Sequence, residues 1–114
     1  MIVYLKFNVF VKNGVYMSKN VSDDKAFWFC TSSGSLGKAA HNLAEFAEGL
    51  KTVPAECLEF HLRDDKNDFE VWLKKIMEEP NFAASMKRIK KKNLNGDTLR
   101  ASVNKLAEKI AKSA

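Results

Sequence analysis

The chain has 114 residues, the length of one domain, and 46% of them are hydrophobic, which is an ordinary share for a globular protein. Its two cysteines are too few for a disulfide scaffold, and no window approaches the roughly 18 consecutive apolar residues that a membrane span needs. The first residues lack the pattern of a secretory signal peptide. We therefore expect a cytoplasmic protein with no membrane partner.

The net charge of +5 is distributed unevenly along the chain. Residues 81–114 hold nine basic and two acidic side chains, whereas the first 80 residues hold ten basic and twelve acidic ones. A localised positive field concentrates polyanions near it, so the C-terminal third is a candidate surface for an anionic partner. The alternative is an ordinary solvated face on a small helical domain.

The N-terminal residues predict a β-hairpin. Apolar residues occupy every odd position from Val3 to Val11, which is the period of a half-buried strand. Asn13-Gly14 is a typical hairpin turn, and a return strand follows it. Because Met17 begins a polar stretch that resembles a natural start, residues 1–16 are alternatively an extension outside the core.

A short aromatic strand is predicted at residues 26–30, with its aromatic side chains packed in the core. Residues 31–37 predict a loop before a helix, which is the context of a phosphate-binding loop. The Walker A pattern fails, because Ser32 stands where glycine is needed and Ala39 where serine or threonine is needed. An ordinary connector is the preferred interpretation, with adventitious anion binding beside Lys38 as the alternative.

Helical periodicity begins at Lys38 and continues to Leu50, where apolar residues recur at spacings of three and four. Pro54 is placed at the first turn of a second, short helix. Asn67 is expected to cap a third helix, with Glu70 completing a capping box.

Two more helices follow, separated from the third by Pro80. Asn95-Gly96 ends the fourth helix, and Asp97 is expected to cap the last one. The last helix carries an apolar seam: Leu99, Val103, Leu106 and Ile110. We expect this seam to pack on the protein's own core, with pairing to another chain as the alternative.

These patterns predict an α+β fold that is mainly helical, with one or two N-terminal strands packed on four to five short helices. The chain is interpreted as a single domain, 1–114. Within it, residues 1–25 are assigned to a β-hairpin extension, 26–94 to the core, and 95–114 to a basic amphipathic C-terminal helix.

Catalytic and metal-binding sites are not predicted. His61 is followed by three aspartates: Asp64, Asp65 and Asp68. The first two are better explained by the end of a helix, so a structural role for His61 is preferred over a metal site. His41 has no cysteine or aspartate at a catalytic spacing, and neither cysteine lies in an electropositive motif. We therefore expect a protein that is not an enzyme and that uses no metal or other cofactor.

Three blocks of the chain, NLAEFAEGL at 42–50, FHL at 60–62 and NDFEVWL at 67–73, resemble an uncharacterised prokaryotic domain family that is frequent in archaea. In that family an aromatic strand precedes the same three blocks. The resemblance covers about residues 26–90 and implies a strand-then-helices order, with the hairpin-like start and the basic end outside it. It implies no activity, ligand or cofactor.

The leading hypothesis is a small non-enzymatic binding module whose basic C-terminal third engages nucleic acid or a ribonucleoprotein surface through phosphate contacts. The candidate contact residues are the basic side chains of this third: Lys87, Arg88, Lys90, Lys91, Lys92, Arg100, Lys105, Lys109 and Lys112. Several of them recur one helical turn apart, so that two helices can present cations outward together. The alternative hypothesis is a protein-interaction domain or homodimer that uses the Leu99–Ile110 seam.

Overall fold

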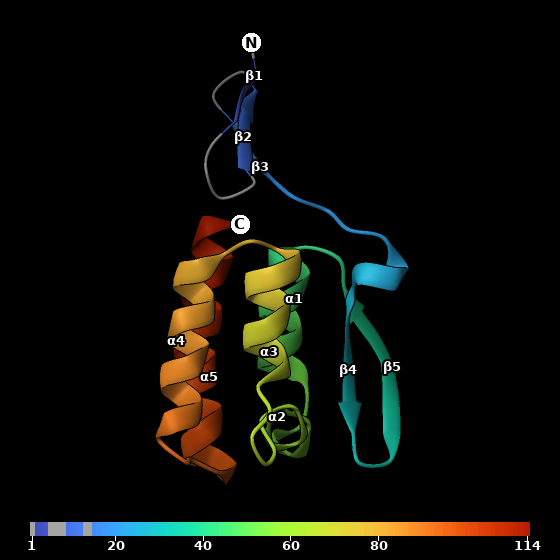
Figure 1. Ribbon diagram of the computed structural model, residues 1–114, viewed down its shortest axis with the longest axis vertical. Helices are drawn as coiled ribbons and strands as arrows, with labels where there is room; N and C mark the ends of the chain where they lie inside the picture. The colour runs from blue at the N-terminus through green and yellow to red at the C-terminus, as the bar shows by residue number, and fades with distance from the viewer. Residues whose placement is uncertain (1, 5–8, 13–14) are drawn as a thin grey trace.

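The computed structural model describes residues 2–4, 9–12 and 15–114, with side chains from residue 19 onward (Figure 1). The predicted turn at Asn13-Gly14 lies outside the described residues, as does the centre of the first predicted strand. The predicted fold class is confirmed, because the chain is α+β and mainly helical.

The N-terminal strands form a small antiparallel sheet in the order β1-β2-β3. They are β1 (Ile2–Tyr4), β2 (Val9–Lys12) and β3 (Val15–Ser18). Val3 pairs with Val11, and Val11 pairs with Tyr16. A single strand from Val3 to Val11 is therefore a wrong prediction, since these two residues face each other on antiparallel strands.

A second antiparallel hairpin consists of β4 (Phe27–Thr31) and β5 (Gly34–Ala40). The prediction that residues 31–37 form a loop is wrong, because the chain turns at residues 32–33 and then returns as a strand. Gly34 and Gly37 have φ angles of 118° and 71°, a region that favours glycine. These glycines accommodate the tight turn and the irregular register opposite Phe29 and Cys30.

The helices are α1 (Leu43–Thr52), α2 (Ala55–His61), α3 (Asp68–Val71), α4 (Pro80–Lys91) and α5 (Gly96–Ser113). The helix expected from Lys38 begins later, because Asn42 caps it by accepting a hydrogen bond from the Glu45 backbone N–H at 2.8 Å. The Asn67 cap is confirmed, since its side chain accepts from the Glu70 backbone N–H at 3.0 Å. The third helix continues from α3 into a π-helical turn, Trp72–Ile76.

Aromatic side chains fill the centre of the core, where β4 packs on α1 and α3. Phe27 lies with its ring centroid 5.4 Å from that of Phe46 and 5.2 Å from that of Phe69. Gly49 lies against this cluster, because a Cβ at that position would clash with the ring of Phe29. The hairpin covers one side of α1 and α3, and α4 and α5 cover the other side (Figure 1).

The apolar seam of α5 is buried inside this core. Leu99, Val103, Leu106 and Ile110 are each at most 4% exposed, and α5 packs on α1 and α2. The prediction that the seam packs on the protein's own core is confirmed. Pairing with a second chain through the Leu99–Ile110 seam is a wrong alternative, because these side chains have no free surface to offer.

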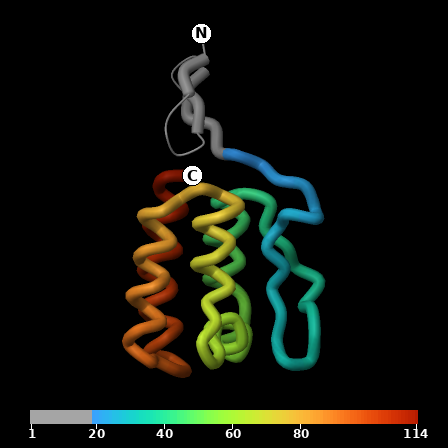
Figure 2. The backbone as a smooth tube through the Cα atoms, in the orientation of Figure 1, coloured from blue at the N-terminus to red at the C-terminus, as the bar shows by residue number. Residues whose placement is uncertain are grey.

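Residues 19–25, called the strap here, connect β3 to β4 along the core (Figure 2). The Val21 backbone N–H donates to the His41 carbonyl at 2.8 Å. The Trp72 indole N–H donates to the Lys25 carbonyl, also at 2.8 Å. The strap is therefore hydrogen-bonded both to the residue that precedes the cap of α1 and to the π-helical turn. In the described part of the chain, no helix is both long and apolar enough to cross a membrane.

Candidate nucleic-acid interface

A basic groove of about 220 Å³ lies between α4 and α5. It is lined by four cations, two hydroxyls and two aliphatic side chains: Arg88, Lys92, Lys105, Lys109, Ser85, Ser102, Ile89 and Leu106. Residues 92–95 join the two helices, so α4 and α5 run antiparallel and each supplies one wall. The two helices thus place four of the predicted cations along one groove.

Helical spacing explains why the cations meet. Arg88 and Lys92 are four residues apart on α4, and Lys105 and Lys109 are four residues apart on α5. The adjoining apolar positions, Met86 on α4 and Val103 on α5, are fully buried. Burying those positions fixes the rotation of each helix about its axis. This rotation directs the cations to the groove between the helices.

The four cations have no anionic partner within residues 19–114. The ion pairs of this part of the chain join other side chains, such as Lys19 with Glu78 and Arg63 with Asp68. No acidic residue lines the groove. The positive charge of the groove is therefore available to an external anion.

Two serines in the groove were not predicted as site residues. The Ser85 hydroxyl accepts a hydrogen bond from the Arg88 guanidinium at 2.9 Å and thereby orients that side chain. The Ser102 hydroxyl is partly buried and has no hydrogen-bond partner within residues 19–114. Their positions three residues before Arg88 and Lys105 are the sequence signal that would have included them.

Two of the nine candidate cations are used inside the protein. The Lys90 ammonium donates to the Leu62 carbonyl and, at 2.8 Å, to the Asp64 carbonyl. The Arg100 guanidinium donates to the Leu50 carbonyl at 2.7 Å and to the Val53 carbonyl, at the C-terminal end of α1. These two side chains stabilise helix ends and do not line the groove.

The remaining three candidates, Lys87, Lys91 and Lys112, are exposed but do not line the groove. Lys87 and Lys91 lie one turn apart on α4. They serve below as a natural control, because they carry the same charge on the same helix.

His61 has a structural environment. Its Nδ1 lies 2.9 Å from the Asp68 carboxylate, and its Nε2 accepts the Cys30 backbone N–H at 2.9 Å. Asp64 and Asp65 make no contact with the ring, in agreement with the interpretation of these residues as a helix end. Burial lowers the pKa of His61, and the hydrogen bond to Asp68 opposes that shift. Both ring nitrogens are occupied, so the ring is not free to bind a metal.

His41 acquires partners that its sequence neighbourhood did not reveal. Its Nε2 lies 2.6 Å from Asp23 on the strap, and its Nδ1 lies 2.9 Å from Glu45 on α1. The hydrogen bond to Asp23, and to a smaller extent the one to Glu45, raises the pKa of His41 and so favours the protonated ring that joins the strap to α1.

Other groups offer no second site. The anion-binding alternative at Lys38 is wrong, because its ammonium bonds the Thr52 hydroxyl and the preceding backbone forms a hairpin. Burial raises the pKa of the Cys57 thiol to about 11, which keeps it un-ionised. Within the described residues, no group of three or more potential ligands is arranged to hold a metal ion.

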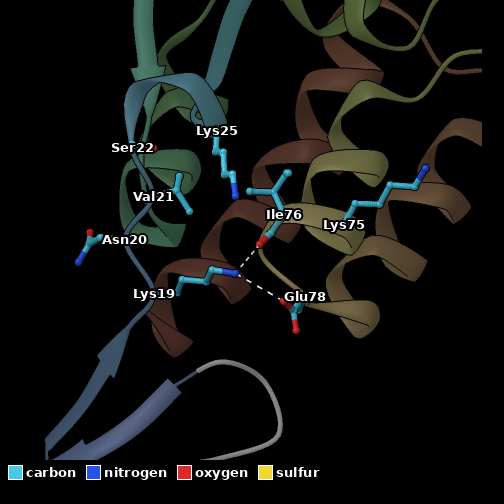
Figure 3. A pocket seen from close by; sticks show the side chains of 8 residues that line it. All are labelled: Lys19, Asn20, Val21, Ser22, Lys25, Lys75, Ile76 and Glu78. Atoms are coloured by element: carbon cyan, nitrogen blue, oxygen red, sulfur yellow. Dashed lines mark hydrogen bonds and ion pairs between the residues drawn. The ribbon is translucent and has the colours of Figure 1, made fainter.

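A larger cavity of about 360 Å³ lies between the strap and the π-helical turn (Figure 3). The Lys19 ammonium in it donates to the Ile76 carbonyl at 2.8 Å and lies 3.6 Å from Glu78. Lys75 extends away from these groups (Figure 3). Lys25 points toward Ile76, the side on which the Lys19 ammonium lies (Figure 3). This cavity differs from the α4–α5 groove because it contains an acidic side chain, Glu78, which pairs with Lys19.

Comparison with known proteins gives one match. Residues 11–108 match the model of a family described as "Family of unknown function (DUF5752)". The match extends beyond the three sequence blocks at both ends and includes α4 and most of α5, whereas the resemblance had left the basic end outside. No curated protein and no solved structure matches the chain.

Proposed function

The chain belongs to the DUF5752 family of unknown function, and we propose that it is a non-enzymatic module that binds the phosphate groups of nucleic acid, free or on a ribonucleoprotein, in the α4–α5 groove. The observation that carries this proposal is the convergence of four cations without an internal anionic partner.

Phosphate is the anion that this groove suits best. Guanidinium and ammonium groups on both walls can each neutralise a phosphate, and releasing the condensed counterions favours binding. The Ser102 hydroxyl adds a donor without an internal acceptor. These groups recognise a charged backbone, not a reacting bond, which supports a binding function over catalysis.

Binding is expected to be independent of base sequence. The groove has no asparagine or glutamine to read a base edge, and its only arginine is held by Ser85. With about four phosphate contacts, the slope of log affinity against log salt on duplex DNA should lie near −3 to −4.

The test compares two variants with the same loss of charge. Arg88→Gln/Lys92→Gln removes two groove cations, and Lys87→Gln/Lys91→Gln removes two exposed cations of the same helix. Fluorescence anisotropy with labelled duplex DNA should show that the first variant flattens the salt slope by about 2, while the second changes it by less than half as much. If both variants flattened the salt slope equally, the groove would not be the binding site. If the wild-type chain did not bind duplex DNA at about 50 mM salt, the proposed function would be wrong.

A further inference from the structure

The size of the groove limits what can enter it. Its volume of about 220 Å³ is below the roughly 300 Å³ at which pockets for small organic ligands begin. A groove of this size does not enclose a whole nucleotide, whereas a phosphate group can enter it. The groove therefore suits the phosphates of a backbone better than a free nucleotide or a base.

The cations on the two walls are spread along the helix axes. Residues four apart on a helix are separated by about 6 Å along its axis. The pairs Arg88/Lys92 and Lys105/Lys109 therefore place cations at two levels on each wall. This arrangement fits successive phosphates of one strand better than a single compact anion.

The groove also lacks what single-stranded nucleic acid needs. Proteins that bind single strands stack the bases on aromatic side chains, and no aromatic residue lines this groove. Within residues 19–114, the one aromatic residue that is exposed is Trp28, at 44%. Trp28 lies on β4, and the α1–α3 layer separates β4 from α4 and α5 (Figure 1).

We propose that the groove receives the phosphate ridge of a double helix. In a duplex the bases remain stacked on each other, so a site without aromatic platforms loses no stacking energy when it binds. The ridge of one strand enters the groove, and the cations of both walls reach its successive phosphates. This inference rests on the proposed function and adds the structural class of its ligand.

The experiment compares ligands that carry equal numbers of phosphates. The wild-type chain is titrated with a duplex DNA, a duplex RNA and an unstructured single strand of twice their length. We expect each duplex to bind about tenfold more tightly than the single strand. Arg88→Gln/Lys92→Gln should remove most of this preference, whereas Lys87→Gln/Lys91→Gln should retain it.

The outcomes separate the two proposals. Equal or tighter binding of the single strand that is lost in Arg88→Gln/Lys92→Gln overturns the duplex inference and leaves the proposed function standing. Failure of all three ligands to bind overturns both. A preference for one duplex over the other supports the inference and identifies the form of helix that fits.

Discussion

The two sides of the helical core use charge differently. On the side of the strap and hairpin, His41 and Lys38 bond to groups of the protein itself. On the side of α4 and α5, four cations line a groove without an internal anion. Charges of the first kind hold distant segments together, and charges of the second kind are available for a ligand. The basic run alone does not distinguish the two kinds, because it contains both.

Replacing Trp72 should have the largest effect of these substitutions on stability. Its contacts lie on the strap and hairpin side of the core, away from the groove. Its indole packs on Phe46 with ring centroids 4.8 Å apart and bonds the strap. Trp72→Ala should lower the free energy of unfolding by about 3 to 5 kcal/mol in chemical denaturation. Val71→Ala is the control, because Val71 is 50% exposed on the same helix and should change little. A stable Trp72→Ala protein with lost nucleic-acid binding would reverse the assignment.

Substituting Arg100 and Arg88 in turn should distinguish a cation that stabilises the fold from one that is available to a ligand. Arg100→Gln removes hydrogen bonds to carbonyls at the end of α1, so the free energy of unfolding should fall by about 1 to 3 kcal/mol. Arg88→Gln should leave stability within about 0.5 kcal/mol and weaken binding. Denaturation and anisotropy on both variants provide the measurement. The comparison fails if Arg88→Gln is the less stable of the two.

The two histidines should titrate in opposite directions from their ordinary pKa of 6.5, with His61 below it and His41 above it. Because its lowered pKa favours the neutral ring in the folded state, the stabilising contribution of His61 is present above pH 6.5 and is lost as pH falls toward that lowered pKa. His41 is stabilising as a cation, so its contribution is present below pH 6.5 and is lost as pH rises through its raised pKa. NMR titration of the ring protons gives both midpoints, and His41→Gln identifies its own signal. Midpoints in the reverse order would contradict the two environments.

Local signals predicted much of the fold. The Asn67 cap, the Pro80 boundary and the seam of α5 all depend on residues within a few positions of each other. β5 was missed because GSLGKAA is rich in glycine and alanine, which are uncommon in strands. The start of α1 was missed although Asn42 and Glu45 have the spacing of a cap, because apolar periodicity was extended back through Ala40.

The sequence predicted that basic residues of the last two helices share a surface, but not which of these residues line the groove. Helical spacing indicates which cations share a stripe, and this held for both groove walls. The internal roles of Lys90 and Arg100 depend on carbonyl groups 28 and 50 residues away, which only the tertiary fold brings close. The same reason explains Asp23 beside His41. No local pattern encodes these long-range hydrogen bonds.

The connection between α4 and α5 has a consequence for the order in which the protein folds. Both walls of the groove come from helices that are adjacent in sequence, and residues 92–95 close the loop between them. Closing so short a loop loses little chain entropy, so this helical pair can form early. The bond from Trp72 to Lys25 spans 47 residues, and ordering the strap must wait for that long closure. The α4–α5 groove is thus expected to form before the strap is hydrogen-bonded to the core.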